Sequence, residues 1–331
     1  MNYIVLDLEW NQGESGPVAP DNDIPFEIIE IGAVKLNSDR VMIDEFSELI
    51  KPQVYKTMHY VTGKLIHLKM QELSFERPFD EVVKNFLDWC GEDYVFCTWG
   101  PLDLFELQRN MAHYNIEAFS DRPLAFYDVQ KLFALEYDED KKRRALESAV
   151  DFLEIDKDIP FHRAFSDAYY TAKVFSRIHR SETLRHYSYD LFTPPIDKEH
   201  EIYSFFGDYD KYISRLFPSK DALLADKDIK RNVCYLCNKA SKRVVHPFSP
   251  SGKFYLSVSL CETHGYVKSK IRIKKTDDDK YFCVRTRKIV TEDVVEDIKK
   301  RYNKLKELKK PVNPAKGPKT SKRKKKDDII V

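Results

Sequence analysis

Residues 3–10 of the chain read YIVLDLEW, an apolar and β-branched run that turns acidic towards its end. Such a run predicts a buried strand that ends in functional residues. Because Asp7 and Glu9 are two positions apart on this strand, both side chains project from the same face. Two carboxylates on one face repel each other unless a cation lies between them. The pair suggests a metal site, although in isolation a solvated strand end without function explains it better.

The pattern around this strand predicts an α/β domain. Further strands are expected at residues 28–36, 44–50 and 94–98. Apolar residues recur at helical spacing within residues 75–89, 102–114, 144–153 and 164–178. The first three strands follow one another closely, as in an antiparallel meander, and helices then alternate with the last strand. This order predicts a mixed sheet with flanking helices.

Two more carboxylates and a histidine stand at the ends of these elements. Asp103 begins a helix just after the strand at 94–98, and Asp167 lies in the first turns of the helix that follows His162. Charge complementarity with the helix dipole, about 0.3–1 kcal/mol, is a simple alternative explanation for Asp103. Taken with the first pair, the set suits Mg²⁺ or Mn²⁺, which prefer oxygen ligands. Two such ions would stabilise the attacking and leaving oxygens of a phosphodiester displacement, with the histidine as base.

These motifs resemble those of a known enzyme family. Residues 1–182 are similar to the DEDDh branch of the DEDD exonuclease superfamily, which includes ribonuclease T, the proofreading epsilon subunit of bacterial DNA polymerase III and the ERI-1-like RNA exonucleases. The first two motifs are matched by Asp7-Leu8-Glu9 and by residues 99–103, WGPLD. The third is matched by His162 and Asp167, with four residues between them. Residues 58–63, MHYVTG, resemble the family's His-x-(Ile/Leu)-Thr-Gly segment.

The resemblance implies a fold, a chemistry and a set of roles. The fold would be ribonuclease H-like, and the reaction a 3′-5′ exonucleolytic hydrolysis that releases nucleoside monophosphates. Two Mg²⁺ or Mn²⁺ ions would be bound by the four carboxylates Asp7, Glu9, Asp103 and Asp167. His162 would be the general base, and Thr62 and Gly63 would lie near the terminal nucleotide. The forms of the second motif and of the Thr-Gly segment favour RNA over DNA.

Near the C-terminal third, cysteines recur at metal-ligand spacing. Cys234 and Cys237 form a Cys-x(2)-Cys pair, and Cys261 and His264 form a Cys-x(2)-His pair. Together they supply the four ligands of a tetrahedral, structural Zn²⁺ site. Four buried side chains or a disulfide remain the alternative. We expect a zinc-ribbon-like module that has too few apolar residues to fold without its metal.

The net charge of +1 hides an uneven distribution. Residues 231–331 hold 28 Lys/Arg against 11 Asp/Glu, a net +17, which leaves −16 for residues 1–230. Basic and aromatic residues alternate around the cysteine pairs, a pattern that favours nucleic-acid binding. Docking to a protein, such as a ribosome or polymerase component, stays open, and the Lys/Arg-rich end also fits a solvated, disordered tail.

Four segments are therefore expected. They are an exonuclease domain at 1–185, a connector with some helix at 186–230, a zinc-ribbon-like module at 231–290, and a polar helix with a basic, disordered tail at 291–331. No membrane helix and no signal peptide are predicted, which points to the cytoplasm. The expected function is a metal-dependent 3′-5′ exonuclease that acts on single-stranded RNA or DNA 3′ ends. The alternative is a catalytically silent nucleic-acid-binding or adaptor protein that has kept the fold.

Overall fold

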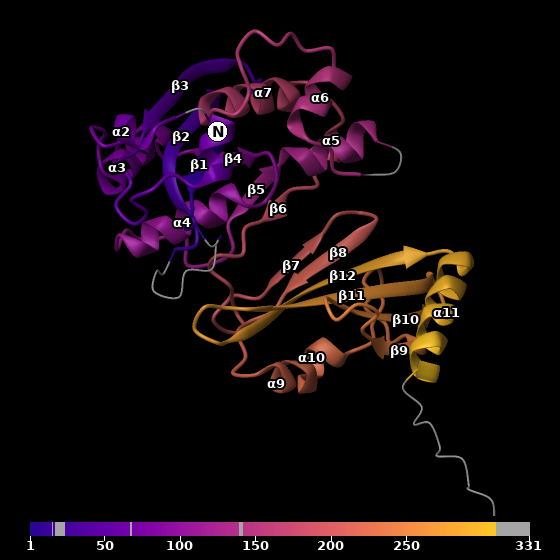
Figure 1. The fold of residues 1–331 in the computed structure, drawn as a ribbon. Helices are drawn as coiled ribbons and strands as arrows, with labels where there is room; N and C mark the ends of the chain where they lie inside the picture. The colour runs from indigo at the N-terminus through magenta and orange to yellow at the C-terminus, as the bar shows by residue number, and fades with distance from the viewer. Residues whose placement is uncertain (15, 17–23, 67, 139–141, 309–331) are drawn as a thin grey trace, which may run out of the picture. The chain divides into compact units, whose positions relative to one another are not determined.

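The computed structural model of the protein describes residues 1–14, 16, 24–66, 68–138 and 142–308. Its first sheet has six strands in the order β3-β2-β1-β4-β5-β6 (Figure 1). Their bounds are β1 Asn2–Asn11, β2 Glu27–Leu36, β3 Met42–Leu49, β4 Tyr94–Thr98, β5 Ala125–Asp128 and β6 Ser188–Tyr189. Strand β1 pairs antiparallel with β2 and parallel with β4. The mixed sheet predicted from the sequence is thereby confirmed.

Helices cover both faces of this sheet (Figure 1). They are α1 Tyr60–Ile66, α2 Met70–Leu73, α3 Phe79–Cys90, α4 Asp103–His113, α5 Val129–Tyr137, α6 Leu146–Phe152, α7 Ala164–Ser176 and α8 Ser181–Leu184. On β1, Ile4 and Leu6 pack in a core with α3 and α4, whereas Val5 packs in a second core with α5, α6 and α7. Because side chains alternate along a strand, Asp7 and Glu9 share the face of Val5, which α7 covers.

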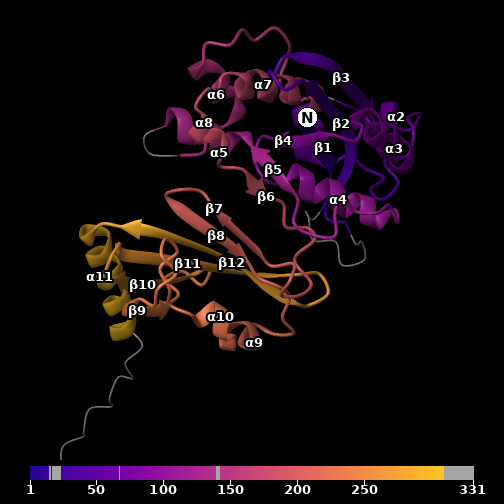
Figure 2. The same cartoon turned by 180° about the vertical axis from the view of Figure 1, so that it is seen from behind.

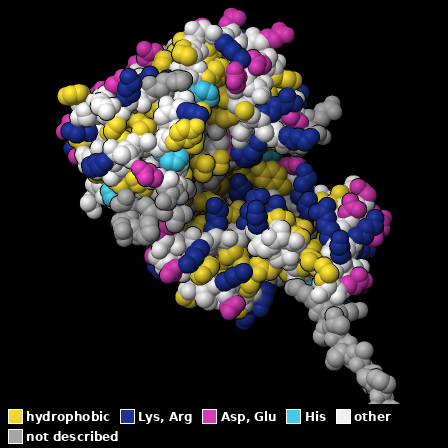
Figure 3. Space-filling model, in the orientation of Figure 1, with side chains coloured by type: hydrophobic (Ala, Val, Ile, Leu, Met, Phe, Trp, Pro, Cys, Tyr) yellow, Lys and Arg dark blue, Asp and Glu magenta, His cyan; other side chains and the backbone are white. Residues whose placement is uncertain are grey.

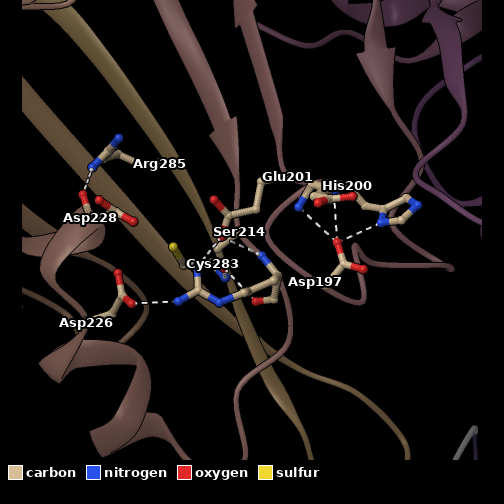
Figure 4. Close-up of polar contacts among 10 residues, drawn as sticks. Asp197, His200, Glu201, Ser214, Asp226, Asp228, Cys283 and Arg285 are labelled. Carbon is tan, nitrogen blue, oxygen red and sulfur yellow. Dashed lines mark hydrogen bonds and ion pairs between the residues drawn. The ribbon is translucent and has the colours of Figure 1, made fainter.

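A second six-stranded sheet follows in the order β7-β8-β12-β11-β10-β9. Its strands are β7 Ile202–Phe205, β8 Tyr209–Ile213, β9 Lys242–Phe248, β10 Tyr255–Cys261, β11 Gly265–Lys275 and β12 Tyr281–Val290. Just past the end of β8, the backbone N–H of Ser214 donates to the Cys283 carbonyl at 3.0 Å, and its hydroxyl accepts from the Cys283 N–H at 2.9 Å (Figure 4). The remaining helices are α9 Lys220–Ala225, α10 Lys227–Lys230 and α11 Glu292–Leu308. Both views place α11 beside β9 and β10 (Figures 1 and 2), where Val295 and Ile298 are buried.

The second sheet is larger than the short β-like runs at 254–260, 271–273 and 281–286 suggested. Strand β11 is eleven residues long. Its apolar and basic residues alternate with the period of two that is typical of a strand, but the many charges make this pattern hard to recognise in the sequence. The stretch expected to be a connector with some helix holds α9 and α10, and also β6, β7 and β8. The strand and helix at 125–137 were not anticipated.

Contacts divide the chain into two units, Met1–Asp226 with Lys274–Val284 and Lys227–Ile273 with Arg285–Val331. The domain boundaries predicted at residues 185, 230 and 290 stay a proposal. The expected disordered tail from residue 309 onwards lies outside the described residues. Among the helices that are described, none combines the length and apolarity needed to cross a bilayer.

Candidate active site

A cleft of about 410 Å³ opens where β1 and β4 end. Asp7, Glu9, Asp103 and Asp167 all line it, from three different elements. One carboxylate oxygen from each of Asp7, Glu9 and Asp167 lies within 4.8 Å of the others, so this group could hold a metal ion. Asp103 is not part of that tight group, but it lines the same cleft from the first turn of α4 and is only 7% exposed.

Close packing of α7 on β2 brings Asp167 to the strand pair. Asp7 pairs across the sheet with Gly32 of β2. A Cβ atom on Gly32 would lie 2.0 Å from the Phe165 nitrogen and 2.1 Å from the Ala164 carbonyl carbon. The start of α7 therefore rests on the bare backbone of Gly32, an approach that only glycine permits.

An ion pair fixes the same helix end. Glu30 on β2 pairs with Glu9 across the sheet and is 1% exposed. It accepts hydrogen bonds from Arg163, the residue before α7, with Nε–O distances of 3.0 and 3.1 Å and an Nη2–Oε1 distance of 2.9 Å. This forked geometry restricts the arginine more than a single contact would. The pair ties the loop that carries His162 to the central sheet.

His162 lies next to the carboxylates, on the loop before α7. Its backbone N–H donates to Asp167 Oδ1 at 3.3 Å, and its side chain is exposed. Its φ of +67° is in the left-handed region, which non-glycine residues rarely occupy and which is often found at functional sites. The histidine is not among the described residues that line the cleft itself.

Crowding of the four acids changes their protonation. Burial, followed by repulsion from Asp103, Asp167 and Glu9, raises the pKa of Asp7 well above its usual range. Burial and the charge of Asp167 raise the pKa of Glu9 to about 8, although Arg163 opposes this shift. Burial also raises the pKa of Asp103 to about 7. Bound cations would reverse this balance, because they favour the ionised carboxylates.

The predicted substrate residues lie close by on α1. Thr62 is 9% exposed, and its hydroxyl donates to the carbonyl of Trp10, a cleft residue, at 3.3 Å. Neither Thr62 nor Gly63 is among the described residues that line the cleft. The segment before α1 is held by the buried Asn11, whose side chain donates to the Thr57 carbonyl at 2.9 Å and accepts from the His59 N–H at 2.8 Å.

Comparison with protein-family models then identifies the class. Residues 4–175, just over half of the chain, match the model described as RNase_T, Exonuclease. The chain belongs to the RNase_T exonuclease family. The match confirms the enzyme class, an exonuclease, and the expected resemblance of the N-terminal part of the chain to an exonuclease family. Among curated proteins, no sequence matches the chain.

Solved structures similar to the exonuclease domain are distant. A full-length 3′-exonuclease shares 18% identity over 53% of this chain and 59% of its own length, with a TM-score of 0.46. The nuclease domain of 3′hExo, a DEDDh family member bound to rAMP, shares 19% identity over 53% of this chain and 90% of its own, also at 0.46. Exonuclease I of E. coli bound to dT13 shares 11% over 53% and 40%, at 0.42. The chain thus spans less than two thirds of the first of these proteins, and likeness at this level carries no conclusion about activity.

A second cluster lies outside the exonuclease domain. Cys234, Cys237, Cys261 and His264 could together hold a metal ion. The Sγ atoms of Cys237 and Cys261 are 3.7 Å apart, and His264 Nδ1 is 3.6 Å from Cys234 Sγ and 3.7 Å from Cys261 Sγ. Tetrahedral zinc with ordinary bond lengths places two sulfurs about 3.8 Å apart and a sulfur and a nitrogen about 3.6 Å apart. The donor set and its spacing therefore fit zinc, whereas a disulfide would need about 2.05 Å.

Three residues that shape the active site were not predicted from the sequence, although the sequence contains a recognisable signal for two of them. Gly32 lies inside a buried strand, and a glycine in that position often marks close approach of another backbone. Glu30 is a charge inside the same buried run. Arg163 left none, because a basic residue before a helix has no distinctive spacing.

Proposed function

We propose that the protein is a metal-dependent 3′-5′ exonuclease that releases nucleoside monophosphates from single-stranded nucleic acid. The observation that carries the proposal is the convergence of Asp7, Glu9 and Asp167 within 4.8 Å, with Asp103 on the same cleft. Without cations, burial and mutual repulsion raise the pKa of these carboxyls. Such an arrangement is costly unless divalent ions bind there, which supports a catalytic metal site.

The proposed roles follow from position. The four carboxylates would hold two Mg²⁺ or Mn²⁺ ions, which stabilise charge on the attacking and leaving oxygens of a phosphodiester. His162, exposed beside Asp167, would take the proton of the attacking water. Glu30 and Arg163 would keep this loop in register with β1. Thr62 and Gly63 would lie near the terminal nucleotide, and a preference for RNA rests on the motif resemblance alone.

The test is a Mg²⁺ and Mn²⁺ titration on 5′-labelled single- and double-stranded RNA and DNA. A metal-dependent ladder shortened from the 3′ end is expected with single strands. Asp103→Asn, which keeps the side-chain shape, should lower the rate by at least 100-fold. Release of the 5′-labelled nucleotide without a ladder of shortened strands would overturn the polarity. A ladder absent with every substrate would favour the silent, nucleic-acid-binding alternative.

The second cluster would hold one structural Zn²⁺ through Cys234, Cys237, Cys261 and His264. Support comes from the interatomic distances, and Cys234, Cys237 and Cys261 form no disulfide with the other cysteines of the described part of the chain. Reduced thiols also suit the cytoplasm, where we expect the protein to act. Docking to a ribosome or polymerase gains no support from the comparisons.

A further inference from the structure

The two faces of β11 differ in what they contact. Val267, at an odd position, packs with Cys234 and Cys261 of the cysteine cluster. Tyr266, at an even position, packs against the core that α11 forms with β9 and β10. Because side chains alternate along a strand, Lys268, Lys270 and Arg272 lie on the face of Tyr266. They form a row of three cations, with Lys268 and Lys270 half-buried and Arg272 exposed.

The basic residues of β12 are also divided between the two faces of the sheet. Val290 packs in the α11 core and Ile289 packs with the cysteine cluster, so Lys288 shares the face of the row on β11. We call Lys268, Lys270, Arg272 and Lys288 the basic stripe.

The arginines of β12 lie on the opposite face and are used structurally. Arg285 is 5% exposed and donates to the Asp228 carbonyl at 3.1 Å (Figure 4). Arg287 is 8% exposed and donates to the Val233 carbonyl at 3.0 Å. Both guanidinium groups therefore donate to backbone carbonyls of the segment at 228–233. Basic residues that look equivalent in the sequence thus fall into a structural class and a class that a partner could use.

The row of three cations on β11 is electrostatically unfavourable by itself. Burial and the charge of Lys288 lower the pKa of Lys268, and burial with the charges of Arg272 and Lys268 lowers that of Lys270. Within the described residues, no acidic side chain forms an ion pair with Lys268, Lys270 or Arg272 at 4.0 Å or less. Lys270 instead lies over the ring of Phe254, 4.3 Å from its centroid. Lys and Arg side chains also gather over this sheet in Figure 3.

We propose that the basic stripe binds the phosphate backbone of single-stranded nucleic acid. Alternate residues on a strand are about 6.6 Å apart, close to the length of one extended nucleotide. A regular row of like charges suits a partner whose own charges repeat along a chain, and an aromatic ring beside the row suits unpaired bases. The inference rests on the proposed function in one respect, namely that the enzyme's substrate is a nucleic acid. The stripe would hold the strand, and thereby raise the local concentration of its 3′ end.

The test compares two triple variants of the full chain. One is Lys268→Gln/Lys270→Gln/Arg272→Gln. The matched control, Lys227→Gln/Lys230→Gln/Lys239→Gln, makes the same change in net charge. Its three lysines are exposed and lie in or near the segment at 228–233, which contacts the opposite face of the sheet. Fluorescence anisotropy with a 5′-labelled 20-nucleotide oligouridine or oligothymidine, without added divalent cation or chelator, measures affinity from 50 to 200 mM salt.

The stripe variant is expected to bind at least tenfold more weakly, and its slope of log affinity against log salt should be shallower by about 2. The control should stay within twofold of the parent. Parent-like affinity and slope in the stripe variant would overturn the proposal and leave this face to a protein partner. Equal losses in both variants would also overturn it, because binding would then follow net charge alone.

Stability and chemistry are checked separately. Removing charges that repel each other should leave the melting temperature unchanged or higher. If the triple variant does not fold, Lys268→Gln alone should weaken binding about threefold, and parent-like binding by that variant would overturn the proposal. Hydrolysis of a small phosphodiester, thymidine 5′-(p-nitrophenyl phosphate), needs only the active site and should be unchanged. If the parent fails to hydrolyse any substrate, the proposed function fails, whereas the binding comparison still decides the role of the stripe.

Discussion

Replacing Gly32 with alanine should disable the exonuclease site without unfolding the protein. The new methyl carbon would lie 2.0 Å from the Phe165 nitrogen, where ordinary contact begins at 3.4 Å. The start of α7 would therefore have to move by about 1.4 Å, and Asp167 would move with it. A misplacement of about 1 Å can cost roughly 100-fold in rate, whereas overpacking costs about 1–3 kcal/mol of stability.

The assay measures cleavage of a 5′-labelled single strand in Mg²⁺ together with thermal unfolding. Ile31→Val is the matched control, because Ile31 is the next residue on β2 but packs in the core on the opposite face. It should lose about 0.5–1.5 kcal/mol and keep its rate within about twofold. A Gly32→Ala enzyme with parent-like activity would refute the claim that this close contact positions Asp167. An equal loss of rate in Ile31→Val would refute it too.

Three further predictions concern the ion pair, pH and zinc. Arg163→Lys should lower the rate about tenfold and the free energy of unfolding by roughly 2 kcal/mol, because lysine cannot reproduce the forked contact with Glu30. Glu30→Gln/Arg163→Gln should be more stable than Arg163→Gln, which leaves the buried Glu30 unpaired. The reverse order in thermal unfolding would contradict this. Without added Mg²⁺, the free energy of unfolding should fall as pH rises from about 5 to 8, because the pKa of Glu9 is about 8 in the folded protein and 4.5 ordinarily. Mg²⁺ should remove this fall. A free energy of unfolding that instead rises with pH, in a way that Mg²⁺ abolishes, would contradict the prediction. Cys261→Ser should reduce bound zinc, measured by mass spectrometry, from one ion per chain to none; a full complement in the variant would argue against the ligand set.

The sequence predicted features that depend on neighbouring residues better than features that depend on long-range contacts. The strand at residues 94–98 was predicted at its exact bounds, because its periodicity and flanking residues are local. The four carboxylates were predicted from motif order, and the structure brings them to one cleft. Their crowding could not be computed from spacing, since the raised pKa of Asp7 depends on residues of three other elements, β2, α4 and α7.

Long-range features stayed hidden for the same reason. The ion pair of Glu30 with Arg163 joins residues 133 positions apart. The structural use of Arg285 and Arg287 depends on which face of β12 each occupies, and the full length of β11 became evident only in the folded sheet. Sequence composition indicated a basic module, but only strand alternation in the folded sheet separates the basic stripe from the buried arginines.

The central claim is that the four carboxylates hold two divalent cations for phosphodiester hydrolysis. The most direct measurement is anomalous X-ray scattering from crystals grown with Mn²⁺ and a nucleoside monophosphate. The account predicts two manganese peaks about 3.5–4 Å apart, bound by Asp7, Glu9, Asp103 and Asp167. A cleft without manganese at saturating concentration, or a single ion bound away from Asp7, would contradict it.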